Sequence, residues 1–347
     1  MKAIIKARDE AGGVEVADIP VPKVGPGDAL VKIHATGICY SDVTIKKNTY
    51  IGRKPVPIPM VMGHEGAGEI VEVGDGVDPE RVGERVALEP MAGCGTCHQC
   101  ITGHPNMCAS WDHIGITRDG TFAEYISIPS RQVHRIADGV SYPAASLTEP
   151  FGLVVRTLEQ VKPMLGETAT IVGPGSIGLL HLLAFKAAGL AKVIMVGLAA
   201  DAPRFAIAEK LGADACIAVD KEDVAEVIQK LTGEPGTDIV VETASSPKAT
   251  ELALALVAPR GRAALFGLYP KAEFSPVQFA RSGVTAFGDV AQVTRHFVGS
   301  LRIMASGVIN FEPVITHRLT LDQVEEAFEA TKEGNAVKVV FEPQRAG

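Results

Sequence analysis

Thr168-Ala169-Thr170-Ile171-Val172-Gly173-Pro174-Gly175-Ser176-Ile177-Gly178 is the stretch that decides the fold of this 347-residue chain. An apolar strand runs into a Gly-x-Gly-x-x-Gly turn, and a helical pattern follows over 176–188. In this setting the first glycine allows a tight turn, the second lets the backbone approach a pyrophosphate, and the third lets helix and strand pack closely. The helix N-terminus also favours phosphate charge. We expect a dinucleotide site here rather than a purely structural turn, with these cofactor contacts: Gly173, Gly175, Ser176, Ile177 and Gly178.

The same alternation of strand and helix continues through the second half of the chain. Helical patterns at 176–188, 202–211, 223–232 and 247–257 alternate with apolar runs. Alternation of strands and helices at this spacing predicts βαβ units and a parallel sheet. The strands are almost entirely apolar, which is expected when helices cover both faces of a sheet. The sequence therefore predicts an α/β fold with a doubly wound parallel sheet, built on runs at 169–172, 192–196, 215–219, 238–241 and 263–266.

The first half of the chain has a different sequence pattern. Short strand-like runs, at 29–35, 68–73, 85–88 and 122–128, are separated by Gly and Pro. Proline suits loops and sheet edges, so this half is predicted to be a β-rich domain with long loops. After residue 288 the pattern is helix (290–305), strand (314–319), helix (321–332) and strand (336–341), which suggests a return to the first domain. The predicted domains are 1–149 with 289–347, and 150–288.

Composition excludes several classes of protein. The chain has 46% hydrophobic and 21% charged residues and a formal net charge of −8, which suits a soluble α/β protein and argues against a nucleic-acid partner. No apolar run approaches the roughly 20 residues needed to span a bilayer, and charges interrupt the N-terminus where a signal peptide would be apolar. We expect a cytoplasmic protein with no membrane partner.

Four of the six cysteines lie within one short segment. Overlapping Cys-x-x-Cys spacings let one loop present three thiolates to a common centre, and a fourth cysteine closes a tetrahedral shell. With no open position, such a site is structural: zinc would hold a lobe, at about 93–109, that has no core of its own. An iron–sulfur cluster and a redox dithiol pair are the alternatives. The predicted ligands of this structural zinc are Cys94, Cys97, Cys100 and Cys108.

A second set of metal-binding side chains is spread over three segments. These segments are Gly37-Ile38-Cys39-Tyr40-Ser41-Asp42, Gly63-His64-Glu65-Gly66, and Leu147-Thr148-Glu149-Pro150. Thiolate, imidazole and carboxylate together are typical of catalytic zinc. Each residue taken singly has a structural interpretation: a small buried cysteine, a hydrogen-bonded loop histidine, and a carboxylate at a helix N-terminus. The predicted catalytic-zinc ligands are Cys39, His64, Glu65 and Glu149.

The residue at the end of the second apolar strand bears on whether the cofactor is NAD or NADP. An acidic residue that binds the ribose is expected near this position, but Gly197 stands there. The nearest carboxylate is Asp201, and the nearest cation past the strand is Arg204. NAD is favoured, with Asp201 reaching back to the ribose; the missing carboxylate at Gly197 keeps NADP open.

With these motifs in the same order and spacing, the chain resembles the zinc-containing medium-chain dehydrogenases over essentially its whole length. The resemblance implies a GroES-like catalytic domain, a Rossmann cofactor domain and return of the C-terminal segment to the first domain. Glu149 followed by Pro150 is similar to the polyol (sorbitol) and threonine dehydrogenase branch. By resemblance, Asp42 orients the ligand histidine, Ser41 passes the alcohol proton outward, and Lys338 lies near the pyrophosphate.

The predicted function is therefore that of a dehydrogenase with two zinc ions per chain, acting on a secondary alcohol or polyol with NAD or NADP. Zinc would lower the pKa of the alcohol, Ser41 would relay its proton, and hydride would pass to the nicotinamide. The alternatives are an NADPH-preferring carbonyl reductase and a non-catalytic nucleotide-binding relative. Tyr50, Trp111 and His113 are candidate pocket residues that could equally be packing. Family resemblance also implies a homo-oligomer, a dimer or tetramer.

Overall fold

The computed structural model describes residues 1–269, 271–288, 290–332 and 335–345. Two compact units are present: the first comprises Met1–Gly152 with Ala291–Gly347, and the second is Leu153–Val290. Residue 289, where the second segment of the predicted first domain begins, lies outside the described residues. Every described helix is too short or too polar to cross a lipid bilayer.

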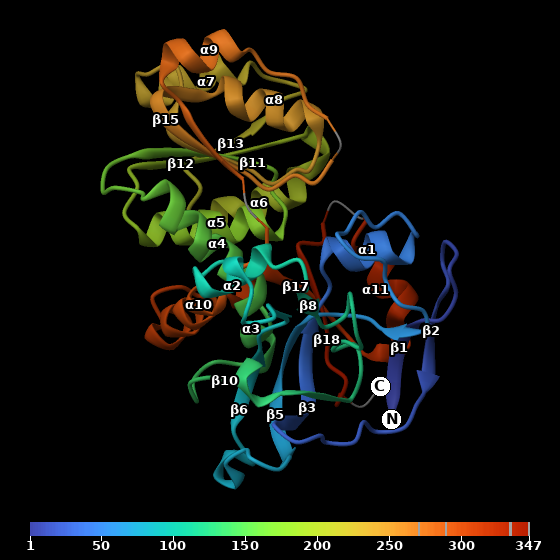
Figure 1. Ribbon diagram of the computed structural model, residues 1–347. Coiled ribbons are helices and arrows are strands. Elements are labelled where there is room, and N and C mark those ends of the chain that lie inside the picture. Colours follow the sequence, from blue (N-terminus) through green and yellow to red (C-terminus); the bar gives the residue numbers. More distant parts are fainter. Residues whose placement is uncertain (270, 289, 333–334, 346–347) are drawn as a thin grey trace. The chain divides into compact units, whose positions relative to one another are not determined.

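The second unit is built on a six-stranded parallel sheet (Figure 1). Its spatial order places the first strand of the unit in the middle and adds later strands outward on both sides, which is the order of two βαβαβ halves. This arrangement confirms the predicted doubly wound fold. The order is β13 (Ala215–Ala218), β12 (Lys192–Gly197), β11 (Thr168–Val172), β14 (Thr237–Glu242), β15 (Val257–Leu265) and β16 (Thr285–Gly288).

Helices cover both faces of this sheet. In Figure 1, α5 and α6 lie on one face, and α7 and α8 lie on the other. The central strands are almost fully buried between them, as with Ile171 and Val240, which are both 0% exposed. The helices are α5 (Ser176–Ala187), α6 (Ala202–Lys210), α7 (Val224–Thr232), α8 (Pro247–Ala255) and α9 (Pro276–Ser282).

The sequence prediction missed one strand and misplaced one boundary in this unit. Strand β16 was not predicted because it is an edge strand with exposed residues at 285, 286 and 288, so it shows no apolar run. The fourth predicted helix was extended to residue 257, whereas β15 begins there: Val257 already pairs with Thr237, and the register shifts between Thr237 and Ile239.

The first unit contains a seven-stranded sheet and a smaller three-stranded sheet. In the larger sheet β3 is the central element, because β5, β9 and β18 all pair with it. The larger sheet comprises β10 (Val133–Arg135), β6 (Arg85–Leu88), β5 (Glu65–Val73), β3 (Asp28–Gly37), β9 (Tyr125–Pro129), β18 (Lys338–Phe341) and β17 (Ile315–Leu319). The smaller sheet is β2 (Val14–Asp18), β1 (Lys2–Lys6) and β4 (Met60–Val61), and a two-stranded ribbon joins β7 (Met91–Ala92) to β8 (Asp112–His113).

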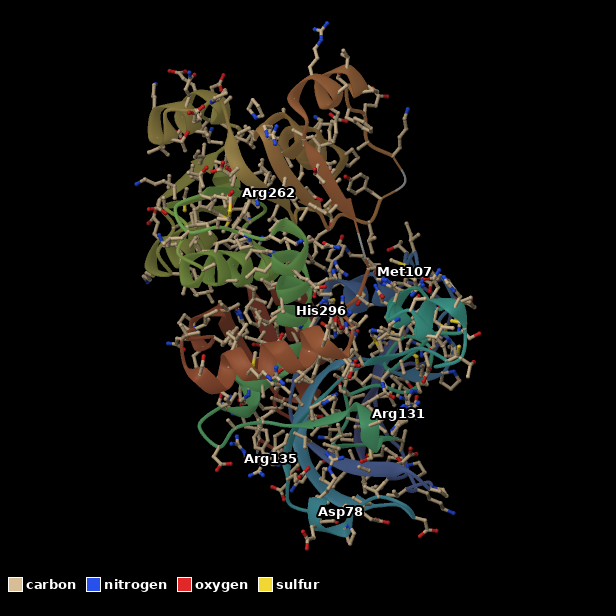
Figure 2. The ribbon with its side chains drawn as sticks, turned by 60° about the vertical axis from the view of Figure 1, so that its left-hand side comes forward. Asp78, Met107, Arg131, Arg135, Arg262 and His296 are labelled. Atoms are coloured by element: carbon tan, nitrogen blue, oxygen red, sulfur yellow. The ribbon has the colours of Figure 1, made fainter. Side chains whose placement is uncertain are left out.

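The chain returns to this unit after residue 290. Strand β18 pairs antiparallel with β3, with Val340 opposite Gly37 and Phe341 opposite Thr36, so an early and a late segment of the sequence share one sheet. Helix α10 (Thr294–Ser306) buries His296, labelled in Figure 2. The predicted helix 321–332 is divided into a 3-10 turn (Leu321–Gln323) and α11 (Val324–Ala330). The remaining helices of the unit are α1 (Tyr40–Lys46), α2 (His98–Ile101), α3 (Tyr142–Ser146) and α4 (Thr148–Val161), the last of which continues into the second unit.

Candidate metal centres and cofactor site

Cys39, His64 and Glu65 come together because β3 and β5 are paired. Gly37, the last residue of β3, lies opposite Glu65, the first residue of β5. Cys39 follows β3 as the N-cap of α1, and His64 precedes β5. The metal-binding atoms of the three side chains all lie within 4.8 Å of one another. The backbone register therefore gathers a sulfur, an imidazole and a carboxylate from segments about 25 residues apart.

Asp42 fixes the other members of this cluster. Its Oδ2 atom accepts the Cys39 backbone N–H at 2.9 Å, and its Oδ1 atom lies 3.7 Å from His64 Nδ1. The side chain is 0% exposed, and burial raises the pKa of Asp42 while His64 and the Cys39 N–H oppose that rise. One buried carboxylate therefore helps to place both Cys39 and His64, as outer-shell carboxylates commonly do for metal-binding histidines.

Several acidic side chains surround His64 in the cluster. Burial lowers the pKa of His64, but the Asp42 carboxylate and the Cys39 sulfur outweigh it and raise that pKa to about 10. A buried imidazole that is surrounded by anionic groups strongly favours a bound cation, either a proton or a metal ion. Asp42 Oδ1 and His64 Nδ1 are both buried without a hydrogen-bond partner among the described residues. The donor types, their spacing and their charge fit a zinc ion.

Lys338 lies in this cluster, a position that the sequence prediction did not anticipate. Its ammonium is 2.5 Å from Glu65 Oε2 and donates to Glu65 Oε1 at 2.7 Å and to the Ile38 carbonyl at 3.0 Å. Gly37 makes room for this pair, because a Cβ there would lie 2.1 Å from Glu65 Oε2 and 2.8 Å from Lys338 Cε. The side chain is 2% exposed, and two hydrogen bonds and an ion pair hold its ammonium inside the first unit. Its contact with the pyrophosphate stays a prediction.

Glu149 stands outside the close cluster. It is buried in the first turn of α4, and it is absent from the group whose ligand atoms lie within 4.8 Å of one another. Burial and the nearby Glu65 carboxylate raise the pKa of Glu149 to about 7, against the opposing effects of His64 and Lys338. The charged groups of the cluster therefore shift the pKa of Glu149, although its carboxylate lies outside the close group of ligand atoms. The hydroxyl of Ser41, two residues after Cys39, is also buried and has no hydrogen-bond partner among the described residues.

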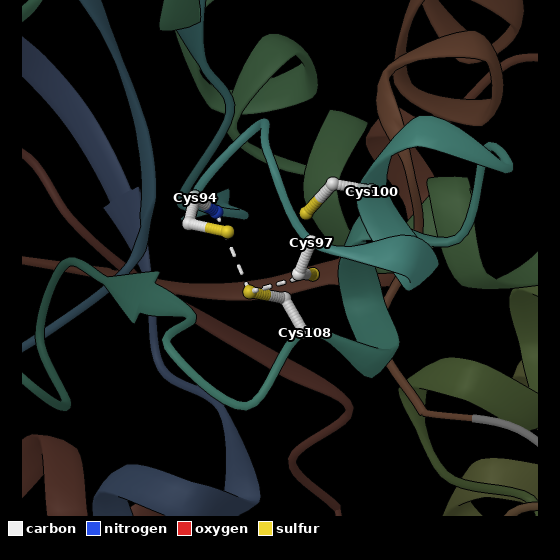
Figure 3. Close-up of side chains that lie close together, drawn as sticks. All are labelled: Cys94, Cys97, Cys100 and Cys108. Carbon is white, nitrogen blue, oxygen red and sulfur yellow. Dashed lines mark hydrogen bonds between the residues drawn. The ribbon is translucent and has the colours of Figure 1, made fainter.

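The four cysteines of the lobe face a common centre (Figure 3). Their sulfur atoms all lie within 4.8 Å of one another, and the Cys97 and Cys108 sulfurs are 3.7 Å apart. Four sulfurs about 2.3 Å from a tetrahedral zinc ion would be about 3.8 Å apart, so this spacing fits zinc. The lobe contributes the short helix α2 and a 3-10 turn (Pro105–Met107) and has little other regular structure. A metal bound to the four sulfurs would therefore supply most of the lobe's order.

Backbone N–H groups in the lobe are directed at the sulfurs. The Cys94 N–H lies 3.4 Å from Cys108 Sγ, and hydrogen bonds from Thr96 lower the pKa of Cys94 to about 6. Burial instead raises the pKa of Cys100 to about 12. At least one thiolate is thus available near neutral pH to begin metal binding, and a bound metal would displace the remaining protons. Gly93 allows this packing, because a Cβ there would lie 2.5 Å from Cys100 Sγ.

The glycine turn of the second unit has the geometry expected for a dinucleotide. Gly173 has a φ of +111°, which only glycine adopts readily. A Cβ at Gly178 would lie 2.0 Å from the Gly173 carbonyl oxygen, whereas a Cβ at Gly175 would meet no atom within 4 Å. The third glycine is therefore needed for packing and the second leaves open space. Thr243, which the sequence prediction did not identify, donates from Oγ1 to the Gly173 carbonyl at 2.9 Å.

The loop after β12 brings a carboxylate to the position of the missing acidic residue. A Cβ at Gly197 would lie 2.9 Å from Asp201 Oδ2, so the Asp201 carboxylate stands directly beside Gly197. Asp201 also accepts the Leu198 N–H at 2.9 Å and lies 3.2 Å from Arg204 Nη1. Asp220, a second carboxylate that the sequence prediction missed, accepts the Ala199 N–H at 2.7 Å. Two carboxylates therefore border this loop.

Comparison with known proteins agrees with both halves of this description. The profile of the alcohol dehydrogenase GroES-like domain matches residues 25–138, and that of the zinc-binding dehydrogenases matches residues 176–306. An L-threonine 3-dehydrogenase of Pyrococcus abyssi is 36% identical over 346 residues, which is 98% of each chain. The chain belongs to the zinc-binding alcohol dehydrogenase family. A sorbitol dehydrogenase of Halalkalibacterium halodurans is 31% identical over 99% of each chain.

A solved structure shows that the likeness extends to the fold. The 2R,3R-butanediol dehydrogenase of Bacillus subtilis superposes with a TM-score of 0.89 at 30% identity, over 99% of each chain. Membership in this family makes the chain a zinc-dependent oxidoreductase that transfers hydride between an alcohol and a nicotinamide cofactor. The predicted GroES-like and Rossmann folds are confirmed.

Proposed function

We propose that Cys39 and His64 hold the reacting zinc of an alcohol or polyol dehydrogenase, with a buried carboxylate completing the site. The observation that supports this assignment is the cluster of Cys39, His64 and Glu65, whose ligand atoms lie within 4.8 Å of one another, with His64 and Glu65 buried. A zinc ion bound there would act as a Lewis acid on the alcohol or carbonyl oxygen. Cys94, Cys97, Cys100 and Cys108 would hold the second, structural zinc.

The two carboxylates have different roles in this proposal. Glu65 is held by Lys338 through contacts of 2.5 and 2.7 Å, so the ammonium competes with the metal for this carboxylate. Glu149 lies outside the innermost group, and we assign it a contact through water. Ser41, whose buried hydroxyl has no described partner, would accept the substrate proton at Oγ and pass on its own. Asp42 is a positioning residue, because it contacts Cys39 and His64 rather than substrate.

The cofactor preference follows from the loop after β12. The Asp201 carboxylate lies where it can accept the ribose hydroxyls and repel a 2′-phosphate, which supports NAD. Arg204 lies 3.2 Å from Asp201 and forms an ion pair with that carboxylate. The contacts to the pyrophosphate are assigned to the backbone of Gly173, Gly175, Ser176, Ile177 and Gly178.

Three further assignments belong to the proposal. The unit Met1–Gly152 with Ala291–Gly347 is the catalytic domain, and Leu153–Val290 is the cofactor domain. The chain forms a homo-oligomer, which the exposed edge strand β16 and the exposed Leu268 and Val277 support. It acts in the cytoplasm on a small-molecule substrate, consistent with six cysteines that form no disulfide.

Zinc content and turnover, measured on the same preparations, test the assignment. The wild type is expected to contain two zinc ions per chain, and Cys39→Ala to contain one and to lose turnover. Cys216→Ala is the matched control, because Cys216 is half-buried on β13 in the other unit. Substrates are screened as polyols, sugar acids and amino alcohols with NAD and NADP. Full activity in Cys39→Ala would refute the metal assignment, and a clear NADP preference would refute the role of Asp201.

A further inference from the structure

Arg53 is an exposed cation of the first unit. It lies in the loop between α1 and β4, and its guanidinium stacks over the Trp111 ring at 4.8 Å from the centroid. One of its N–H groups donates to the Asn106 carbonyl at 2.8 Å. Arg53 is thus held in place by a ring and a carbonyl while its remaining donors stay available.

A short series of ring contacts connects Arg53 to the metal ligand His64. The Trp111 and His113 rings meet edge to face at 5.9 Å, and the His113 and His64 rings do so at 5.2 Å. Arg53 opposes the rise in the pKa of Tyr50 that burial and the Cys39 sulfur cause. All of these residues belong to the first unit.

No carboxylate of the described residues forms an ion pair with Arg53 or with its neighbour Lys54. Lys54 donates to the Trp111 carbonyl at 2.6 Å and lies 5.6 Å from the centre of its ring. Arg118, another cation near His113, is different because Asp112 pairs with it at 2.7 Å. Lys54 and Tyr50 also line a cavity of about 240 Å³. Arg53 and Lys54, which both contact Trp111, therefore carry two positive charges that no described carboxylate pairs with.

We infer that Arg53, assisted by Lys54, binds an anionic group of the substrate, so that the preferred substrate is an alcohol bearing a carboxylate or a phosphate. A guanidinium held over an aromatic ring is already ordered and presents a planar fork that suits either anion. Such a contact would fix the far end of the substrate while its hydroxyl carbon lies at the metal. The inference rests on the proposed function, since it takes Cys39 and His64 to mark the reacting end.

Trp111 offers a direct measurement, because it is the only tryptophan in the chain. The zinc-loaded enzyme is titrated with glycerate, glycerol 3-phosphate and glycerol while tryptophan fluorescence is recorded. The expected result is a saturable change with at least one of the two anions at concentrations where glycerol has no effect. Comparing the two anions separates a carboxylate site from a phosphate site. An equal response to glycerol would overturn the inference.

Variants separate the charge of Arg53 from structural effects. Arg53→Met is expected to weaken the binding of the anionic probe ten- to a hundredfold, as for the loss of a charge-assisted hydrogen-bonded pair, and Arg53→Lys is expected to retain part of it. Arg131→Met is the matched control, because Arg131 is an exposed arginine on another loop of the same unit (Figure 2). Unchanged anion binding in Arg53→Met would overturn the inference.

Turnover is measured separately with the acids and with their neutral analogues. Arg53→Met is expected to raise KM for the acids by a similar factor, and so to lower the ratio of kcat/KM for the acids to kcat/KM for neutral polyols ten- to a hundredfold. Equal losses for both classes of substrate would overturn the inference. If none of the alcohols is oxidised while the fluorescence response still depends on Arg53, the proposed reaction fails and the anion site stands. The two failures are thus distinguishable.

Discussion

Alanine substitutions at Gly175 and Gly178 should separate cofactor binding from folding. At Gly178 a new methyl group would lie 2.0 Å from the Gly173 carbonyl oxygen. That is roughly 1.5 Å closer than non-bonded heavy atoms normally approach, so the turn must shift. Overpacking of this kind costs about 1–3 kcal/mol, which corresponds to a fall in Tm of roughly 3–9 °C for a unit of this size.

Gly175 differs because its new methyl group would meet no protein atom within 4 Å, and its φ of −78° suits any residue. Gly175→Ala should therefore keep Tm within about 1 °C, yet it should weaken NADH binding at least tenfold because the backbone can no longer approach the pyrophosphate. Gly178→Ala should lose both stability and affinity. Tm is measured by differential scanning fluorimetry and NADH binding by titration calorimetry. Normal NADH affinity in Gly175→Ala, or wild-type stability in Gly178→Ala, would refute the geometric argument.

Three other substitutions test the first unit. Cys108→Ser should remove one zinc ion and melt the lobe, measured by metal analysis and by faster proteolysis near residues 93–109, while the catalytic zinc remains. Lys338→Met leaves Glu65 buried without its partner and should destabilise the protein by about 3–5 kcal/mol in urea unfolding, with most of the loss recovered by adding Glu65→Gln; an additive double variant would contradict the pairing. Asp42→Asn keeps an acceptor for the Cys39 N–H but removes the charge beside His64, so zinc affinity should fall about ten- to a hundredfold in chelator competition; unchanged affinity would exclude the positioning role.

Local patterns in the sequence predicted most of the second unit. The glycine turn at Gly173 and the alternation of apolar strands with helices depend on the local sequence of each segment, so they can be recognised without knowledge of the tertiary structure. Strand β16 escaped detection because an edge strand needs no apolar run. Its place in the sheet is set by pairing with Leu265 and its neighbours on β15, a contact between strands that no single segment reveals.

The metal site shows the same division. The residue types at 39, 64 and 65 indicated a mixed zinc shell, and the pairing of β3 with β5 gathers these three side chains. Lys338 was expected near the pyrophosphate, and its pairing with Glu65 depends on a strand that arrives about 270 residues later in the chain. The distance that keeps Glu149 outside the innermost group is likewise a tertiary quantity. Sequence patterns give the chemistry of side chains, whereas their separations come from the packing of distant segments.

The position of β18 in the sheet has a consequence for synthesis on the ribosome. Leu153–Val290 is translated as one uninterrupted segment and can fold as soon as it has emerged. The N-terminal segment must wait, because Thr36 and Gly37 at the end of β3 lack their partners on β18, and Glu65 lacks its cation, until Lys338, Val340 and Phe341 have been made. During that interval the nascent chain exposes unpaired strand residues and an incomplete metal site, so chaperone contacts and zinc delivery should be needed most just before Lys338 and Val340 are made.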